Sequence, residues 1–67
     1  MNVPQEKLEK VIRLLPSLNA PTVAGLYHTT WFSVESIVES KVVRDLIPRL
    51  IKAGAEGIIE YPLNKVI

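Results

Sequence analysis

The lone histidine and two of the glutamates are the first side chains to consider for acid–base chemistry. His28 has the imidazole of a general base or a metal ligand, but no partner lies at a recognisable spacing from it, and we interpret it as a surface residue at the end of a strand. Glu35 and Glu60 could form a pair of catalytic carboxylates. Such a pair needs a deep cleft to separate the two pKa values, which a chain of 67 residues is too small to build. We therefore interpret both glutamates as part of a solvated sheet face.

A Gly-Ala-Glu-Gly stretch at residues 54–57 matches the GxxG loop with which KH modules hold nucleic acid. In those modules the loop joins two helices and carries basic residues, whereas here it lies between a predicted helix and a predicted strand and contains Glu56. We interpret the stretch as the C-terminal cap of a helix followed by a tight turn. Small residues at such a turn still let a ligand approach the backbone closely.

Four aromatic side chains could form a platform on which nucleic-acid bases stack, namely Tyr27, Trp31, Phe32 and Tyr61. RNA-recognition sheets of this kind combine aromatic with basic residues, and the acidic Glu35 and Glu60 contradict that pattern. Core and edge packing is the alternative that we favour. The sequence also contains no Walker loop, nucleophile elbow or zinc-ligand spacing. It therefore indicates a small binding or regulatory module rather than a catalyst.

Composition and charge narrow the class of protein. The 67 residues are 48% apolar and 22% charged, with a net charge of +1 and no cysteine. These values predict one globular domain over residues 1–67, and they exclude a two-domain enzyme and a disulfide-stapled mini-protein. Basic and acidic residues are interspersed, so we expect neither a nucleic-acid partner nor a membrane. Because the sequence has no secretory signal and no apolar run of ~20 residues, we expect a cytoplasmic location.

Apolar spacing predicts a first helix over Pro4–Leu15. Pro4 suits the first helical position, where its missing N–H costs nothing, and Pro16 ends the helix because it pushes the preceding residue out of the α region. The apolar residues recur at i, i+3, i+4 and i+7, as on a helix that buries one stripe. They are Leu8, Val11, Ile12 and Leu15.

A loop over Ser17–Pro21 precedes two segments that are rich in β-branched and aromatic residues. These segments, Thr22–His28 and Trp31–Val38, flank a short polar break at residues 29–30, which is typical of an antiparallel hairpin. Side chains alternate along a strand. In the second segment we expect Phe32, Val34 and Val38 on the core face, with Trp31, Ser33, Glu35 and Ile37 on the other.

A second helix is predicted over Lys41–Ala53, with Ser40 as its N-cap and Gly54 in the left-handed conformation beyond its end. Pro48 removes one hydrogen bond inside this helix and should bend it. A short strand over Gly57–Tyr61 completes the pattern. The apolar stripe of the helix comprises Val43, Leu46, Ile47 and Leu50.

The predicted order is helix, strand, strand, helix, strand. One further strand in front makes it βαββαβ, a ferredoxin-like α+β arrangement in which an antiparallel sheet carries two helices on one face. Only Met1–Val3 precede the first helix, which is short against the usual ~5–6 residues of a strand. The first strand is therefore short or truncated. Either three residues suffice, or the chain is cut from a longer one, or a neighbouring chain fills the gap.

Several short stretches follow one another in an order and spacing that resemble one known family. They are Asn2-Val-Pro, Leu8-Glu-Lys-Val-Ile, Leu14-Leu-Pro, Ala20-Pro-Thr-Val, Leu26, Trp31, Leu46-Ile-Pro, Gly54-Ala-Glu-Gly-Ile and Tyr61-Pro-Leu-Asn-Lys. Together they cover almost the whole chain, and they resemble the C-terminal regulatory domain of long-form ATP phosphoribosyltransferase, the first enzyme of histidine biosynthesis. No single stretch is diagnostic; the specificity lies in the ordered set, which includes Pro48.

The resemblance implies an ACT-type, ferredoxin-like fold that does no chemistry itself and holds no cofactor. It implies a domain that binds L-histidine and transmits feedback inhibition to the catalytic domains that precede it in a hexameric enzyme. Those domains use ATP, phosphoribosyl pyrophosphate and magnesium, and without them this chain is expected to have no transferase activity. The implied partners are L-histidine, other copies of the chain and the catalytic domains of a parent enzyme.

The resemblance also implies an effector site. Its matching positions are Thr22, Leu26, Ala55, Glu56, Gly57 and Ile58. The sequence departs from the family pattern at Ala24-Gly25, where Ser-Pro is usual, and at Tyr27–Thr30, where an acidic residue is common. A lost carboxylate removes a partner for the ammonium or imidazolium group of the ligand.

The alternative function is a structural module that associates with other chains through its sheet. The short first strand suggests it, because strands without a full set of partners invite pairing with another chain.

Overall fold

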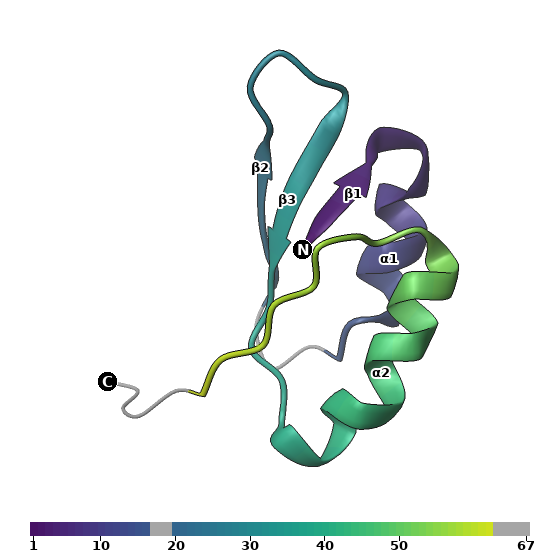
Figure 1. Ribbon diagram of the computed structural model, residues 1–67, viewed down its shortest axis with the longest axis vertical. Helices are drawn as coiled ribbons and strands as arrows, with labels where there is room; N and C mark the ends of the chain where they lie inside the picture. The colour runs from purple at the N-terminus through teal and green to yellow at the C-terminus, as the bar shows by residue number, and fades with distance from the viewer. Residues whose placement is uncertain (17–19, 63–67) are drawn as a thin grey trace.

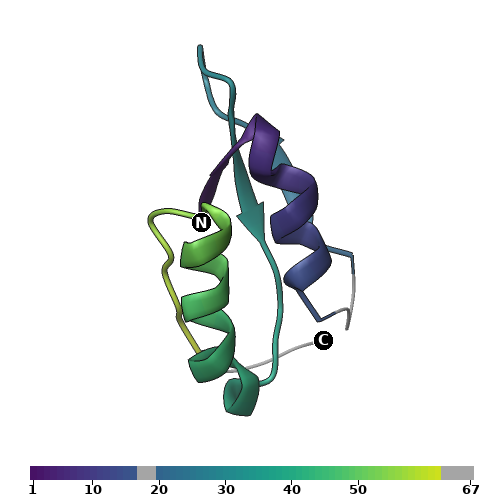
Figure 2. The same ribbon diagram turned by 90° about the vertical axis from the view of Figure 1, so that its right-hand side faces the viewer.

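Three antiparallel strands and two α-helices make up the computed structural model, which describes residues 1–16 and 20–62. Both helices lie on the same side of the sheet, as Figures 1 and 2 show from two directions. In chain order the elements are β1 (Asn2–Pro4), the 3-10 helix η1 (Gln5–Lys7), α1 (Leu8–Leu14), β2 (Thr22–Gly25), β3 (Trp31–Glu35) and α2 (Ser40–Ala53). The predicted α+β class and the short first strand are confirmed. The loop predicted over Ser17–Pro21 falls largely outside the described residues.

The strand order β1–β3–β2 places β3 in the middle of the sheet. On one side of β1, Val3 pairs with Phe32 of β3. On its other side, Asn2 and Glu56 exchange two backbone hydrogen bonds, of 2.7 Å from the Asn2 N–H and 2.8 Å from the Glu56 N–H. The segment after α2 thus lies beside β1, where the last strand of a βαββαβ arrangement belongs. The topology is compatible with the predicted ferredoxin-like fold.

The strand predicted over Gly57–Tyr61 is wrong, because its segment pairs with β1 only through the single bridge at Glu56. In the antiparallel register of that bridge, the next residue that could bond to β1 is Ile58, and it faces a position ahead of Met1. Gly57 also has a φ of +59°, which turns the backbone out of the extended conformation. The residues after Glu56 therefore run past β1 without a ladder partner.

The first helix follows the predicted apolar spacing but begins later than Pro4. This proline has φ −68° and ψ 151°, ends β1 opposite Trp31 and precedes η1 in an extended conformation, so it is not the first helical residue. The helix ends at Leu14, and Leu15 is extended with ψ 128°, as a residue before proline should be. Val11 of the predicted stripe is fully buried.

The second helix spans Ser40–Ala53 and is followed, as predicted, by Gly54 in the left-handed conformation with φ +112°. The prediction of Ser40 as N-cap is wrong, because Ser40 is already helical and the extended Glu39 precedes it without a side-chain capping bond. The helix continues through Pro48, where the bend stays a prediction. Its buried residues are Leu46, Leu50 and Ala53. No helix in the described part of the chain is long and apolar enough to cross a membrane.

The predicted antiparallel hairpin is present as β2 and β3. Both strands are shorter than predicted, because a turn occupies residues 26–30 and β3 ends before the predicted boundary. In the turn, the Thr29 N–H donates to the Leu26 carbonyl at 3.2 Å, and the Trp31 N–H donates to the Thr29 hydroxyl at 3.0 Å. His28 has a φ of +56°, which is incompatible with a strand.

The core lies between the sheet and the two helices. Val3, Val11 and Val34, from β1, α1 and β3, are exposed by 1% or less. On the other face of β3, Ser33 is half-buried and Glu35 is exposed, in agreement with the predicted alternation. The remaining core residues are Leu46, Leu50, Ala53 and Ala55.

Candidate functional site

A wide groove of about 1140 Å³ opens between the end of β3, α2 and the segment that follows α2. This last segment is drawn in yellow-green in Figures 1 and 2, and Figure 2 shows it apart from the end of β3. Thr22, at the start of β2, lines the groove together with Gly57 and Ile58. The groove therefore joins the two parts of the sequence that the family resemblance assigns to an effector site.

The groove combines core residues with polar groups. Val34, Leu46 and Leu50 of the core line it. The Ser36 hydroxyl oxygen is buried and has no hydrogen-bond partner among the described residues. Ser40 and the exposed Glu60 also line the groove, as do Ser33 and Glu35, which lie on the face of β3 opposite Val34. Such a lining can hold a small molecule that carries both an apolar part and a cationic group.

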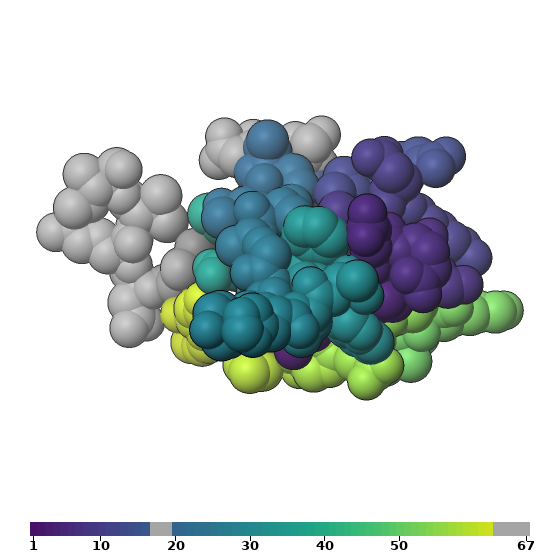
Figure 3. Space-filling model, turned by 90° about the horizontal axis from the view of Figure 1, so that it is seen from above, coloured from purple at the N-terminus to yellow at the C-terminus, as the bar shows by residue number. Residues whose placement is uncertain are grey.

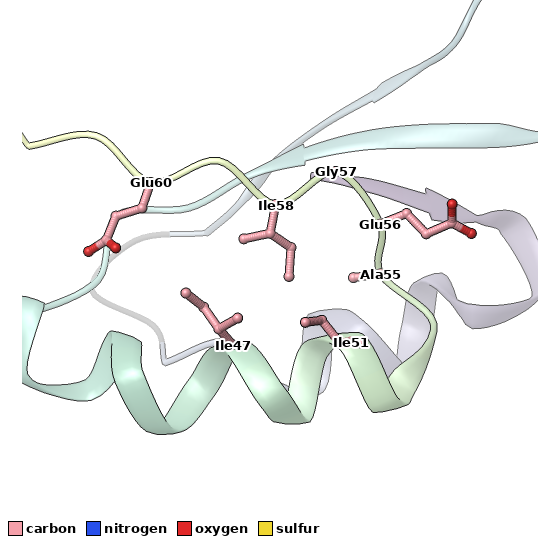
Figure 4. Close-up of a pocket in the computed structure, with 7 residues that line it drawn as sticks. All are labelled: Ile47, Ile51, Ala55, Glu56, Gly57, Ile58 and Glu60. Carbon is pink, nitrogen blue, oxygen red and sulfur yellow. The ribbon is translucent and has the colours of Figure 1, made fainter.

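A smaller hollow of about 360 Å³ lies between α2 and the turn that follows it. Ile47 and Ile51 of α2 point into it from one side and Ile58 from the other, whereas Glu56 points away (Figure 4). Ala55 is buried, and its N–H donates a 3.0 Å hydrogen bond back to α2. The interior of this hollow is apolar, so it suits an apolar group better than a charged one.

Gly54 and Gly57 determine the course of the backbone in the turn after α2. Gly54 has φ +112°, and a Cβ there would lie 3.0 Å from the Cγ of Lys7. Gly57 has φ +59°. Both conformations belong to the region that favours glycine. The interpretation of the Gly-x-x-Gly stretch as a helix cap followed by a tight turn is confirmed.

The six positions implied by the resemblance are not all brought together. Four of them line the smaller hollow: Ala55, Glu56, Gly57 and Ile58. Thr22 shares the larger groove with Gly57 and Ile58. Leu26 lines neither space, because it lies beyond β2 in the turn, where its N–H donates to the Trp31 carbonyl at 2.9 Å.

The other candidate residues do not converge. His28 stacks on Tyr27 in the exposed turn, with ring centroids 3.8 Å apart and planes inclined by 16°. Trp31 and Phe32 are consecutive in β3 and therefore point to opposite faces of the sheet. Within residues 1–16 and 20–62, no group of three or more His, Cys, Asp or Glu side chains is placed to hold a metal ion.

Two features of the groove were not found from the sequence. Glu60 does not lie on a sheet face, as we had expected, but on the segment after α2, and it lines the groove together with Glu35. Ser36 was also missed. Its signal is the alternation of β3, because continuing the core face beyond Val34 places a hydroxyl where an apolar residue is expected.

The strand order, the bridge from the segment after α2 to β1, and the two helices on one face define a small α+β domain of the ferredoxin-like type. Its groove is the candidate site for a small molecule in this domain. The family model described as "HisG, C-terminal domain" matches residues 1–65, and the chain belongs to this family.

Comparison with curated proteins agrees with the family. The chain is 66% identical to the ATP phosphoribosyltransferase of Desulfosudis oleivorans and 69% identical to that of Nitratidesulfovibrio vulgaris strain DP4. It is 57% identical to ATP phosphoribosyltransferase 1 of Geobacter sulfurreducens. Each match covers 100% of this chain but only 23% of the relative, so the chain spans about a quarter of the length of these proteins. No solved structure shows significant similarity to the chain.

Proposed function

We propose that this chain is the regulatory domain of an ATP phosphoribosyltransferase of histidine biosynthesis and that it binds L-histidine as a feedback effector. Membership of the family over residues 1–65 and 66% identity to a protein of that name support the proposal. The chain transfers no phosphoribosyl group by itself. When the effector is bound, it transmits feedback inhibition to the catalytic domains of an oligomeric, cytoplasmic parent enzyme. Magnesium is required in those catalytic domains.

One observation carries the assignment of the effector site to the larger groove. Thr22 and the pair Gly57 and Ile58 are far apart in the sequence, and they line the same groove. A ligand that touches all three would join the start of β2 to the segment after α2. These parts of the chain are otherwise connected through β1, whose backbone bonds to Glu56 are 2.7 and 2.8 Å long. Effector binding would therefore stabilise one arrangement of the segment relative to the sheet, which is the requirement for coupling to another domain.

The lining of the groove matches the chemistry of L-histidine. Glu35 and Glu60 offer carboxylates for its ammonium group or its imidazolium ring, in place of the acidic residue that the family commonly has after Leu26. The unpartnered Ser36 hydroxyl can bond to the ligand carboxylate. Val34 and Leu46 supply apolar contact for the side chain.

Isothermal titration calorimetry with L-histidine tests the proposal on the 67-residue chain. We expect saturable heat in the micromolar range, and thermal stabilisation of ~1–3 kcal/mol at large ligand excess. Absence of heat with millimolar ligand would contradict effector binding by this chain.

Charge variants locate the site. Glu35→Gln and Glu60→Gln should each weaken binding roughly 10-fold or more, because each removes a charged hydrogen-bond acceptor. Glu9→Gln is the matched control, since Glu9 is exposed on α1 and lines neither space. If the control weakens binding as much as the other two variants, general charge attraction explains the heat and the groove is not the site.

A second candidate function, association with other chains through the sheet, is favoured by one observation. β2 lies at the end of the strand order, and all four of its residues are exposed. Sedimentation over a wide concentration range tests this function, which fails if the chain stays monomeric throughout.

A further inference from the structure

The side chains that line the larger groove carry an unbalanced set of charges. Two of them are carboxylates, Glu35 from β3 and Glu60 from the segment after α2. No lysine, arginine or histidine is among the described residues that line it. The cationic group that does line it is the terminal ammonium of Met1, which already donates a hydrogen bond of 3.1 Å to the Val34 carbonyl. The groove therefore offers more negative than positive charge to a ligand.

The lysines and arginines in the described part of the chain lie on the helices. Those nearest along the chain to the part of α2 that lines the groove are Lys41 and Arg44, and both are exposed. Lys41 forms an ion pair of 3.3 Å with Glu39. Within residues 1–16 and 20–62, no ion pair engages Glu35 or Glu60. The full set of these cations is Lys7, Lys10, Arg13, Lys41, Arg44, Arg49 and Lys52.

The single histidine of the chain lies too far from the groove to alter its charge. His28 is in the turn before β3, and this turn is at the top of Figure 1 and faces the viewer in Figure 3. β3 runs from Trp31 beside the turn to Glu35 at the groove, a length of about 13 Å by the rise of a strand. This length exceeds the Debye length of about 8 Å at physiological ionic strength. An imidazole that titrates in the groove therefore belongs to the ligand.

We propose that the groove binds its effector with the imidazole ring in the protonated, imidazolium form. This inference rests on the proposed function and adds the charge state of the ligand, which then carries two cationic groups for the two carboxylates. A carboxylate within about 4–6 Å of a cation favours the charged form of that cation. The imidazole of free histidine has a pKa of about 6.5, so binding above that pH takes up a proton from solution.

Glu35 is placed to receive one of the two cationic groups. It stands opposite Thr22 in the pairing of β2 with β3, so the two side chains share one face of the sheet, with Cβ atoms ~4.5–5.5 Å apart. Thr22 is one of the positions that the family resemblance implies for the effector. A ligand that contacts Thr22 therefore lies beside an exposed carboxylate.

Glu60 reaches the groove from a second part of the chain. It follows Gly57 and Ile58, two other positions implied for the effector, on the segment after α2. In Figure 4 its carboxylate lies at the other end of this segment from that of Glu56, which does not line the groove. The buried Ser36 hydroxyl lines the groove as well and leaves a hydrogen bond for the ligand carboxylate. The groove thus has separate partners for the cationic groups and for the anionic group of an amino acid.

Isothermal titration calorimetry on the full 67-residue chain tests the charge state of bound L-histidine. The imidazolium form falls from roughly 75% of the free ligand at pH ~6 to about 3% at pH ~8, so the affinity should fall at least ~10-fold over this range. At pH ~7.5, titrations in phosphate and in Tris, whose ionisation enthalpies differ, should show uptake of more than ~0.5 proton per ligand bound. His28→Asn should take up the same number of protons, and asparagine tolerates the φ of +56° at this position.

Charge variants show whether the two carboxylates cause the pH dependence. Glu35→Gln and Glu60→Gln should each lower the ratio of the affinities at the two pH values by ~3-fold or more, because each leaves less negative charge beside the imidazolium ring. Glu9→Gln is the matched control, since Glu9 is exposed on α1 and lies outside the groove, and it should keep the full ratio.

The outcomes separate the charge state from the function on which it rests. Saturable binding of L-histidine with equal affinity at both pH values and no proton uptake would overturn the imidazolium form and leave the proposed function in place. Absence of heat with L-histidine at both pH values would contradict the proposed function. Histamine, which has the same ring and an ammonium group but no carboxylate, then decides: binding with proton uptake supports the imidazolium form for another ligand, and absence of heat overturns both proposals.

Discussion

At Gly54 the chain leaves α2 and must return to the sheet within two residues. The Gly54 N–H donates to the Ile51 carbonyl at 3.0 Å, which closes the last turn of the helix. Its φ of +112° then redirects the backbone, so that Glu56 reaches Asn2. This left-handed residue therefore brings Glu56, from which the groove-lining segment continues, to β1.

Gly54→Ala should lower the free energy of unfolding by about 1–2 kcal/mol, because an L side chain is strained at this φ. The Cβ would also lie 3.0 Å from the Cγ of Lys7, although that flexible side chain can move. Urea denaturation followed by circular dichroism measures the loss. Gly25→Ala is the control, since the nearest atom to its added Cβ is 3.9 Å away, and it should change stability by less than ~0.5 kcal/mol. Equal losses in the two variants would refute the conformational explanation.

At the scale of elements, α2 departs from ideal helix chemistry at two points. It begins after Glu39 without a side-chain capping bond, and it contains Pro48, which cannot donate to the carbonyl one turn back. Packing compensates, because Leu46 and Leu50 bury their side chains against the sheet and α1. The helix is thus held by its core face rather than by its ends.

Pro48→Ala should raise the free energy of unfolding by about 1–3 kcal/mol, because Pro48 is exposed and its replacement restores a helical hydrogen bond without loss of packing. Thermal unfolding followed by circular dichroism gives the measurement. A fall in stability would mean that proline, by restricting the unfolded chain, contributes more free energy to stability than the restored hydrogen bond does.

The start of α2 provides a second measurement on the same helix. Ser40→Ala should leave the stability within ~0.5 kcal/mol of the parent, because the Ser40 side chain makes no capping bond. Replacing an N-cap serine by alanine lowers the free energy of unfolding by about 1 kcal/mol. A loss of that size would show that Ser40 is the N-cap.

The elements were predictable where local signals decide them. The apolar spacing that includes Val11 and Leu46 specifies two helices, and Gly54 specifies where the second one ends. The ends of strands were predicted wrongly where contacts outside the strand itself determine them. The hydroxyl of Thr29 bonds within the hairpin turn, and the segment after α2 pairs with β1 only at Glu56. Neither contact is visible in local composition.

The candidate site was likewise predictable where local sequence determines it and not where distant residues do. The four consecutive positions after Gly54 were found through the family resemblance, and they do line one hollow. Glu35 and Glu60 come from different parts of the chain, and only the folded topology brings both to the groove. The sequence could not predict that Leu26 lines neither space, because the end of β2 depends on the turn that follows it.

For the molecule as a whole, the register between Asn2 and Glu56 limits how far the sheet extends. Four β-forming residues, such as Thr-Val-Thr-Val, added ahead of Met1 would lengthen β1 and give Ile58 and Glu60 partners. We expect hydrogen exchange at these two amides to slow at least ~10-fold. An extension of the same length made of glycine and serine is the control. Equal exchange in both extended chains would show that Gly57, rather than the missing partner, keeps this segment out of the sheet.

The pairing of β1 also sets the order of events during synthesis on a ribosome. Val3 pairs with Phe32, and Asn2 bonds to Glu56, so β1 finds its partners only after most of this domain has been made. A nascent chain that stops before Glu56 leaves one side of β1 without its bonds and the core without Ala55. The domain must therefore fold late, with its hydrophobic segments exposed to chaperones until α2 and the turn after it have left the exit tunnel.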